Sequence, residues 1–208
     1  MPLSDDTIGD FLGQLAARVP APGGGAAAAL QAAMAAALLS MVARYTSGAR
    51  YAEHEQTIGH IISEADELSG IALRLAEADA DAFTAVTEAY RLPRDTAEED
   101  AARDGAVQRA LVNAAWPPAQ VISLAEVVVN IAEALAVIGN RNVVSDVAAA
   151  AEAARAAAAT ARVNIEINLA DISDEQASME IIAQAGKADD VIERASRVTA
   201  TVRAQIRA

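Results

Sequence analysis

A carboxylate interrupts an apolar pattern in the first half of the chain. Between residues 51 and 90, apolar residues recur at alternating spacings of three and four, which predicts a helix with one face in a core. The position that this pattern reserves between Leu75 and Ala82 holds Asp79. Burying an unpaired carboxylate is costly, so Asp79 needs a partner, water or a role. Asp79 is therefore a candidate acid or base, and the alternative is a small helix rotation that places it at the rim.

Three consecutive glycines lead into an alanine-rich segment. Gly23, Gly24 and Gly25 follow Pro22, and the apolar stretch begins at Ala26. Glycines let the backbone approach a ligand closely, and a helix N-terminus offers free N–H groups and a positive dipole end. The glycine run is therefore a candidate binding site for a carboxylate, a phosphate or a polarised carbonyl group. The alternative is a tight turn between two closely crossing helices.

A polar turn later in the chain is a third candidate. Asn140 and Arg141 lie in it, and Asp146 follows at the start of the next expected helix. Capping by Ser145 and Asp146 explains part of this polarity. The polar groups beyond one cap favour a binding or catalytic site.

Two asparagines, Asn164 and Asn168, lie four residues apart in an apolar context. Side chains at this spacing share a helix face, so both amides can contact one polar ligand or bond across an interface. Asp146 lies on nearly the same azimuth as Asn164, but eighteen helical residues span about 27 Å. If both residues are functional, they contact different parts of a long ligand or belong to sites completed by another subunit.

The two histidines and the absence of cysteine give little support for a metal site or for thiol chemistry. The two histidines, His54 and His60, are six residues apart and lie on roughly opposite faces of a helix, which predicts solvated surface and no shared metal. The chain has no cysteine, which excludes disulfides and suits a reducing cytoplasm.

The periodicities predict an all-α protein, a compact bundle of about six to seven helices in a single domain over residues 1–208. No stretch alternates with period two. We expect the prolines at 117 and 118 to stop one helix and a new one to begin at Ala119. We expect Ser4 to cap the first helix. The helices expected are 4–18, 26–43, 51–90, 97–116, 119–138, 145–169 and about 175–207.

Composition limits the partners. Hydrophobic residues make up 53% of the chain but aromatics only 3%, so stability must come from many close contacts between helices. This favours long helices and an oligomer. The net charge of −13 disfavours nucleic acid and anionic membranes. The segment Ala26–Ala43 has the length of a membrane span, but Gln31, Ser40 and the lack of a cationic leader favour a central buried helix.

Together these segments resemble the cyclodeaminase/cyclohydrolase family of tetrahydrofolate enzymes. The resemblance covers essentially the whole chain, in order. It is carried by the motifs at 21–25, 79–83, 91–99, 139–146 and 164–169. Family members follow the second helix with glycine, two or three basic residues and an aromatic, whereas this chain has Gly48-Ala49-Arg50-Tyr51 with one cation.

The resemblance implies a helical, cytoplasmic homodimer that holds folate near its subunit interface. It implies that Asp79 and Asp146 are the candidate catalytic groups. It also implies that Gly23, Gly24, Gly25, Asn140 and Asn164 belong to the substrate-binding site. Either the glycine run or the two cations Arg50 and Arg141 can hold the anionic glutamate tail of the substrate. No metal and no cofactor beyond the tetrahydrofolate substrate is expected.

Two reactions of the family need a carboxylate that stabilises positive charge and moves a proton. A cyclohydrolase adds water to the carbon that bridges N5 and N10 of methenyltetrahydrofolate. A cyclodeaminase closes 5-formiminotetrahydrofolate to the same methenyl compound and releases ammonia. We favour the cyclohydrolase, with the cyclodeaminase as the alternative. An inactive folate-binding or scaffold protein is the alternative of another class.

Overall fold

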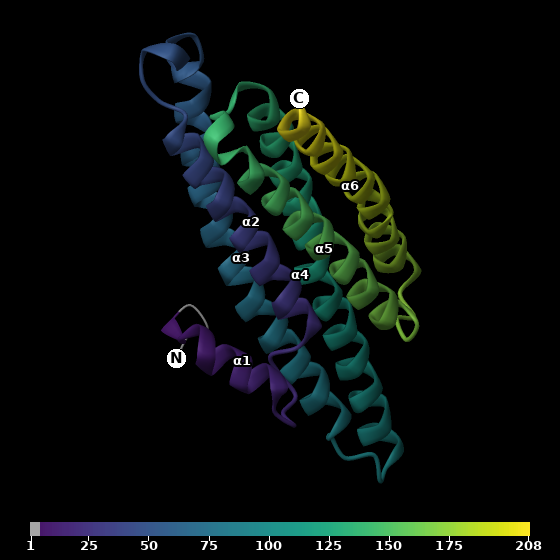
Figure 1. Ribbon diagram of the computed structural model, residues 1–208. Helices are drawn as coiled ribbons and strands as arrows, with labels where there is room; N and C mark the ends of the chain where they lie inside the picture. Colours follow the sequence, from purple (N-terminus) through teal and green to yellow (C-terminus); the bar gives the residue numbers. More distant parts are fainter. Residues whose placement is uncertain (1–4) are drawn as a thin grey trace.

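The computed structural model describes residues 5–208, in which the regular elements are all helices and no strand occurs. Within residues 6–208, six α-helices and two short 3-10 helices follow one another (Figure 1). In order, they are α1 Ile8–Ala16, α2 Gly24–Tyr45, η2 Ala49–His54, α3 Glu55–Tyr90, α4 Ala97–Ile138, η3 Arg141–Val143, α5 Val144–Leu169 and α6 Glu175–Arg207. The prediction of an all-α bundle is confirmed.

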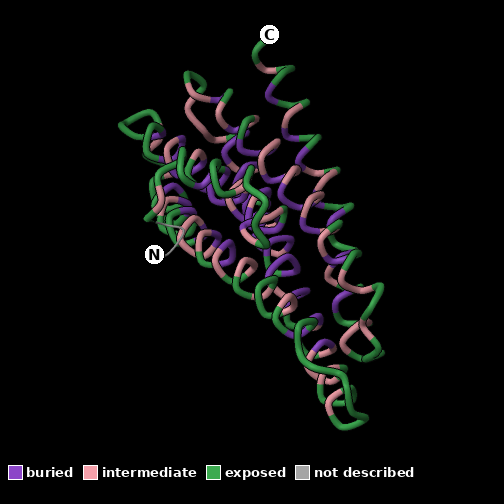
Figure 2. The backbone as a smooth tube through the Cα atoms, turned by 90° about the horizontal axis from the view of Figure 1, so that it is seen from below, coloured by how far each residue is buried: buried purple, intermediate pink, exposed green. Residues whose placement is uncertain are grey.

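Helix α2 packs against three other helices of the bundle. It packs against α3, α5 and α4, and α6 covers α4 and α5 on the other side (Figure 1). Small side chains allow this close approach, because α2 buries a series of alanines that leave almost no gap between helices: Ala26, Ala28, Ala29, Ala32, Ala35 and Ala36. Figure 2 shows the buried positions turned inward on every long helix. Many small contacts therefore form the core, as the composition predicted.

The first helix begins later than expected. The N-cap is Thr7, whose side chain accepts a hydrogen bond from the Asp10 backbone N–H. The predicted cap, Ser4, lies outside the described residues. Helix α1 stands apart from the main bundle (Figure 1), and its Ile8 is 82% exposed.

The prediction that prolines divide the fourth helix is wrong. Helix α4 runs unbroken for 42 residues through Pro117 and Pro118. A proline at position 118 lacks the N–H that would bond the Ala114 carbonyl. The side-chain amide of Asn168 on α5 donates to that carbonyl instead, at 3.4 Å. A neighbouring helix thus supplies one of the missing donors, and the bundle has one long helix where two were expected.

Helices α2 and α4 are both long and apolar enough to cross a membrane by length and composition. In each of them more than half of the most apolar window is buried inside the bundle, 61% in α2 and 56% in α4. Core helices of soluble proteins have the same property. The expectation of a buried helix over 26–43 holds for the sides of α2 that pack against α3, α4 and α5, whereas Met34 on the outer side is 52% exposed.

Candidate functional site

The Asp79 carboxylate lies against the first turn of α2. Asp79 is in the second half of α3, and its carboxylate fills the space directly beside the Gly25 Cα. A side chain at position 25 would overlap the carboxyl oxygens. The glycine at this position is therefore needed for the close approach of α3 to the start of α2.

Two opposing effects act on the pKa of Asp79. Burial disfavours the charged form and raises the pKa, while the backbone N–H of Ala26 donates to the carboxylate and lowers it. Burial is the larger effect, and the pKa rises from 3.8 to about 6. A carboxyl group with this pKa exchanges protons readily near neutral pH, which is what general acid–base catalysis requires.

Two amide side chains of α5, those of Asn164 and Asn168, lie near the Asp79 carboxylate and the glycine run. Asn164 lies beside Gly24, and its Nδ2 donates to the Thr160 carbonyl at 2.9 Å. Asn168 Nδ2 donates to the Asn164 carbonyl at 3.0 Å. Neither Oδ1 accepts a hydrogen bond from the described part of the chain. These two oxygens are therefore available to a ligand.

These groups line one cavity of about 150 Å³. Its polar wall contains the three glycines, Asp79, Asn164 and Asn168, and its apolar wall contains Pro20, Phe83, Ala114 and Ile167. At the mouth, Phe83 is 49% exposed and Ile167 is 71% exposed. The cavity thus has a polar floor and an apolar rim, a combination typical of small-molecule sites.

The remaining predicted residues form a second group at the opposite end of α2. The Asn140 side chain donates to the Tyr45 carbonyl at 2.7 Å, and its backbone N–H donates to Thr46 Oγ1 at 3.0 Å. These bonds tie the loop before α5 to the end of α2. Asn140 therefore has a structural role, and half-buried Asp146 follows it in the first turn of α5.

Arg50 and Arg141 are exposed at this second end. The Arg50 guanidinium lies over the Tyr51 ring, 5.5 Å from its centroid. Because α2 has 22 residues, the two ends are about 33 Å apart. The fold of a single chain therefore brings Gly23, Gly24, Gly25, Asp79 and Asn164 together, but it does not place Arg50, Asn140, Arg141 or Asp146 with them.

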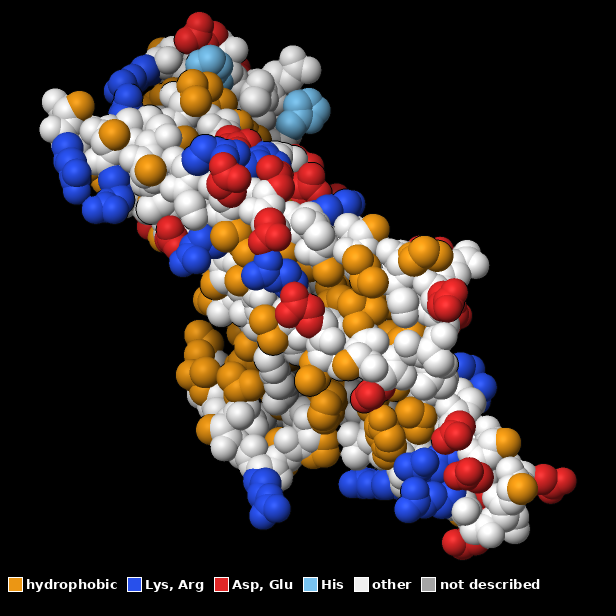
Figure 3. Space-filling model, turned by 90° about the vertical axis from the view of Figure 1, so that its right-hand side faces the viewer, with side chains coloured by type: hydrophobic (Ala, Val, Ile, Leu, Met, Phe, Trp, Pro, Cys, Tyr) orange, Lys and Arg blue, Asp and Glu red, His pale blue; other side chains and the backbone are white. Residues whose placement is uncertain are grey.

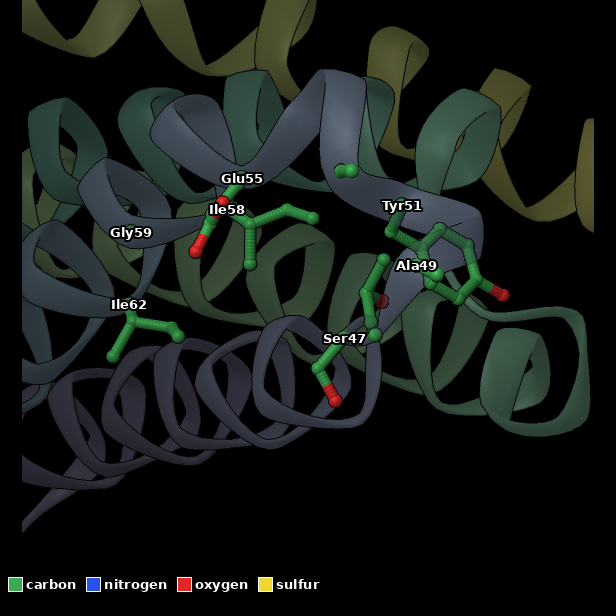
Figure 4. Close-up of a pocket in the computed structure, with 10 residues that line it drawn as sticks. Ser47, Ala49, Tyr51, Glu55, Ile58, Gly59 and Ile62 are labelled. Atoms are coloured by element: carbon green, nitrogen blue, oxygen red, sulfur yellow. The ribbon is translucent and has the colours of Figure 1, made fainter.

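A larger cavity of about 420 Å³ opens at the second end (Figure 4). Figure 4 shows Ala49 and Tyr51 of η2 on one side and Ile58, Gly59 and Ile62 of α3 on the other. The backbone enters η2 through Gly48, whose φ of 92° favours glycine. The segment 48–51 thus forms a cavity wall.

Sequence reasoning missed the apolar rim and this second cavity. Phe83 is one turn after Asp79 and is one of only two phenylalanines, which was a usable signal. Glu55, which lines the second cavity, opens α3 as an ordinary first-turn acid. Nothing in its spacing indicates a cavity, because the wall opposite comes from η2.

Comparison with known proteins places the chain in a family. The family model described as Formiminotransferase-cyclodeaminase matches residues 7–187. The chain is 38% identical over 171 residues to methenyltetrahydrofolate cyclohydrolase of Methylorubrum extorquens, and the match covers 82% of both proteins. It is 38% identical over 177 residues to formimidoyltransferase-cyclodeaminase of Mus musculus, covering 83% of this chain but 32% of the mouse protein.

The fold agrees with these matches. The crystal structure of formiminotetrahydrofolate cyclodeaminase from Thermotoga maritima superposes with a TM-score of 0.87 at 31% identity and covers 98% of each chain. The all-helical fold and the match over most of the sequence therefore support the same family assignment. The chain belongs to the formiminotransferase-cyclodeaminase family.

Proposed function

We propose that the protein is a methenyltetrahydrofolate cyclohydrolase in which Asp79 is the acid–base group. The observation that carries the proposal is the Asp79 carboxyl group, with a pKa of about 6, in a cavity at the start of α2. The match to the Methylorubrum cyclohydrolase over most of both chains supports the choice of substrate.

The proposed reaction opens the ring between N5 and N10. Ionised Asp79 stabilises the cationic bridging carbon and takes a proton from water as the new C–O bond forms. Asp79 then returns this proton to N5 as the C–N5 bond breaks. The hydroxyl proton of the intermediate leaves to solvent, so 10-formyltetrahydrofolate and one net proton are produced.

The second function of this cavity is to orient the substrate through the amide side chains of Asn164 and Asn168. The side-chain oxygens of Asn164 and Asn168 can accept hydrogen bonds from N–H groups of a ligand in the cavity, and the start of α2 adds backbone donors. Such contacts hold the reacting carbon next to the carboxylate, and orientation of this kind supplies much of an enzyme's acceleration.

The cyclodeaminase reaction is the second candidate, because it forms the same bridged carbon. The matches to the mouse and Thermotoga proteins favour it. One experiment separates the two: methenyl absorbance is followed with 5,10-methenyltetrahydrofolate and, separately, with 5-formiminotetrahydrofolate. Enzyme-dependent loss of absorbance from the first supports the cyclohydrolase, and gain from the second supports the cyclodeaminase. No change in either assay contradicts both.

A homodimer formed through α2 completes the proposal. Five large side chains form a stripe along the outer side of α2, and no charged residue occurs between Gly24 and Ala43. The stripe contains Leu30, Met34, Leu38, Met41 and Tyr45. By contrast, Figure 3 shows acidic and basic side chains of both signs distributed over the face that α6 occupies. Two copies of a chain with net charge −13 approach each other best through an uncharged face.

A further inference from the structure

Two prolines in the interior of α4 each leave one backbone carbonyl without its usual donor. A proline has no N–H, so it cannot donate to the carbonyl four residues before it. Pro117 therefore frees the Asn113 carbonyl, and Pro118 frees the Ala114 carbonyl. Ala114 lines the cavity around Asp79, whereas Asn113 lines a separate cavity beside α4. Pro118 is thus the proline whose freed carbonyl belongs to a residue of the candidate site.

The Ala114 carbonyl helps to fix the orientation of the Asn168 side chain. Asn168 Nδ2 donates to the Ala114 carbonyl at 3.4 Å and to the Asn164 carbonyl at 3.0 Å, so both of its protons are used. If the amide were flipped, Oδ1 would face these two carbonyl oxygens, and two attractive contacts would become repulsive. Oδ1 therefore stays on the other side of the amide, in a residue that lines the cavity with Asp79.

The neighbouring amide has a weaker anchor. Asn164 Nδ2 donates to the Thr160 carbonyl of its own helix at 2.9 Å and to no other group within residues 5–208. One bond leaves an amide free to turn, whereas the two carbonyls that hold Asn168 belong to two different helices, α4 and α5. Asn168 Oδ1 is therefore the amide acceptor of fixed direction in this cavity.

We propose that Pro118 is a positioning residue, which acts through Asn168 to orient the attacking water. Because Pro118 removes a backbone N–H from α4, the Ala114 carbonyl is left to anchor the Asn168 amide, and the amide oxygen accepts a hydrogen bond from the water. The inference rests on the cyclohydrolase reaction proposed above. Water is one of the two substrates of that reaction, and Asn168 is the amide that holds it.

The water has two O–H donors, and Asp79 and Asn168 are two acceptors in one small cavity. A volume of about 150 Å³ corresponds to about five water molecules, which keeps both acceptors close to the same water. One O–H donates to ionised Asp79 and the other to Asn168 Oδ1, so a lone pair of the water oxygen is directed at the bridging carbon.

Protons and electrons balance in this arrangement. As the C–O bond forms, the first proton moves to Asp79, and the second stays on the new hydroxyl group, which donates to Asn168 Oδ1. The electron pair of the C–N5 bond then goes to N5, which receives the first proton from Asp79. The hydroxyl proton leaves to solvent as the formyl C=O bond forms.

Asn168→Ala tests the contact with water. The variant loses the acceptor that aligns the water, and misplacement of a reacting group by about 1 Å lowers a rate by about hundredfold. The kcat for methenyltetrahydrofolate should fall by about that factor, while KM changes little because the folate itself does not contact Asn168. A rise in KM with unchanged kcat contradicts the assignment of this amide to the water.

Pro118→Ala tests the positioning. The alanine N–H competes for the Ala114 carbonyl, and loss of one hydrogen bond by Asn168 corresponds to about a two- to tenfold lower kcat. Pro117→Ala is the matched control, because it makes the same change one residue earlier, at a proline whose freed carbonyl is that of Asn113. Wild-type kcat in Pro118→Ala, or an equal loss in Pro117→Ala, overturns the inference.

A double variant separates positioning from a general effect on α4. If Pro118 acts through Asn168, adding Pro118→Ala to Asn168→Ala should not lower kcat further. A second loss as large as that in the wild-type background shows that the two residues act independently and overturns the inference.

Hydrogen exchange of the Asn168 side-chain amide, followed by NMR, measures the anchoring without substrate. Exchange should be faster in Pro118→Ala than in the wild type and unchanged in Pro117→Ala, because only the first variant takes a hydrogen bond from this amide. Equal exchange in all three proteins overturns the positioning role even where turnover is normal. A wild-type protein that shows the expected exchange but no turnover of methenyltetrahydrofolate contradicts the proposed function instead.

Discussion

The Asp79 carboxylate occupies the space that a side chain at Gly25 would need. The Asp79 carboxylate and the glycine run therefore form one structural unit. Helix α3 carries the carboxyl group, and the first turn of α2 has no side chain at Gly25 that would block it. The separation between the two helices fixes the depth of the carboxylate in the cavity. Its raised pKa follows from that depth.

Gly25→Ala should therefore displace the carboxylate. An added Cβ overlaps both carboxyl oxygens, and a shift of the reacting group by about 1 Å lowers a rate by about hundredfold. The kcat for methenyltetrahydrofolate measures this loss. Gly186→Ala on α6 is the control, because a Cβ there meets no atom within 4 Å. Wild-type kcat in Gly25→Ala contradicts the coupling.

The stability of the protein should depend on pH through Asp79. A carboxyl group with a pKa raised from 3.8 to about 6 contributes stability below pH 3.8, and that contribution is lost as the pH rises through about 6. Asp79→Asn removes the buried charge. The free energy of unfolding of Asp79→Asn relative to wild type should increase between pH 4 and pH 8, as measured by urea titration. A difference that does not change with pH contradicts the raised pKa.

Asn168 and Pro118 should be coupled energetically. Asn168→Ala leaves the Ala114 carbonyl without the donor that replaces the proline N–H, at a cost of about 1–3 kcal/mol. Pro118→Ala restores a backbone N–H for the same carbonyl. In a double-mutant cycle, Asn168→Ala should therefore cost less in the Pro118→Ala background. Equal costs in both backgrounds would show that the two residues act independently.

A charge on the outer stripe of α2 should separate the subunits. Met34 is 52% exposed at the midpoint of the stripe. In Met34→Glu, two buried like charges would face each other across the two-fold axis, so the protein should sediment as a monomer and lose turnover. Met179→Glu, at an exposed methionine of α6, should leave the assembly unchanged. A wild-type assembly in Met34→Glu places the interface elsewhere.

Local patterns in the sequence were enough to predict most of the fold. The spacing of apolar residues located α3 and showed Asp79 as the carboxylate that interrupts its apolar face. The capping box at Thr96 marked the start of α4. The helix break predicted at Pro117 and Pro118 was wrong, because Asn168 on another helix replaces one of the hydrogen bonds that the prolines remove. That replacement depends on packing, which no local pattern contains.

The composition of the site was harder to predict. The sequence identified Gly25 and Asp79 separately as candidate site residues, but their direct contact depends on how α2 and α3 cross. The separation of Arg50 from Asp79 depends on the length of α2 between them. The cavity beside Glu55 depends on η2 folding back over α3. Each of these is a relationship between elements, whereas the sequence patterns described one element at a time.

The pH dependence of kcat/KM for 5,10-methenyltetrahydrofolate tests the central role of Asp79 most directly. After subtraction of the uncatalysed reaction, wild-type kcat/KM should rise with pH through an apparent pKa of about 6, where Asp79 becomes ionised. Asp79→Asn should lower the rate by about 10²–10⁴-fold and remove this rise. An Asp79→Asn protein that keeps the wild-type rate and the same pH profile would assign the proton transfer to another group.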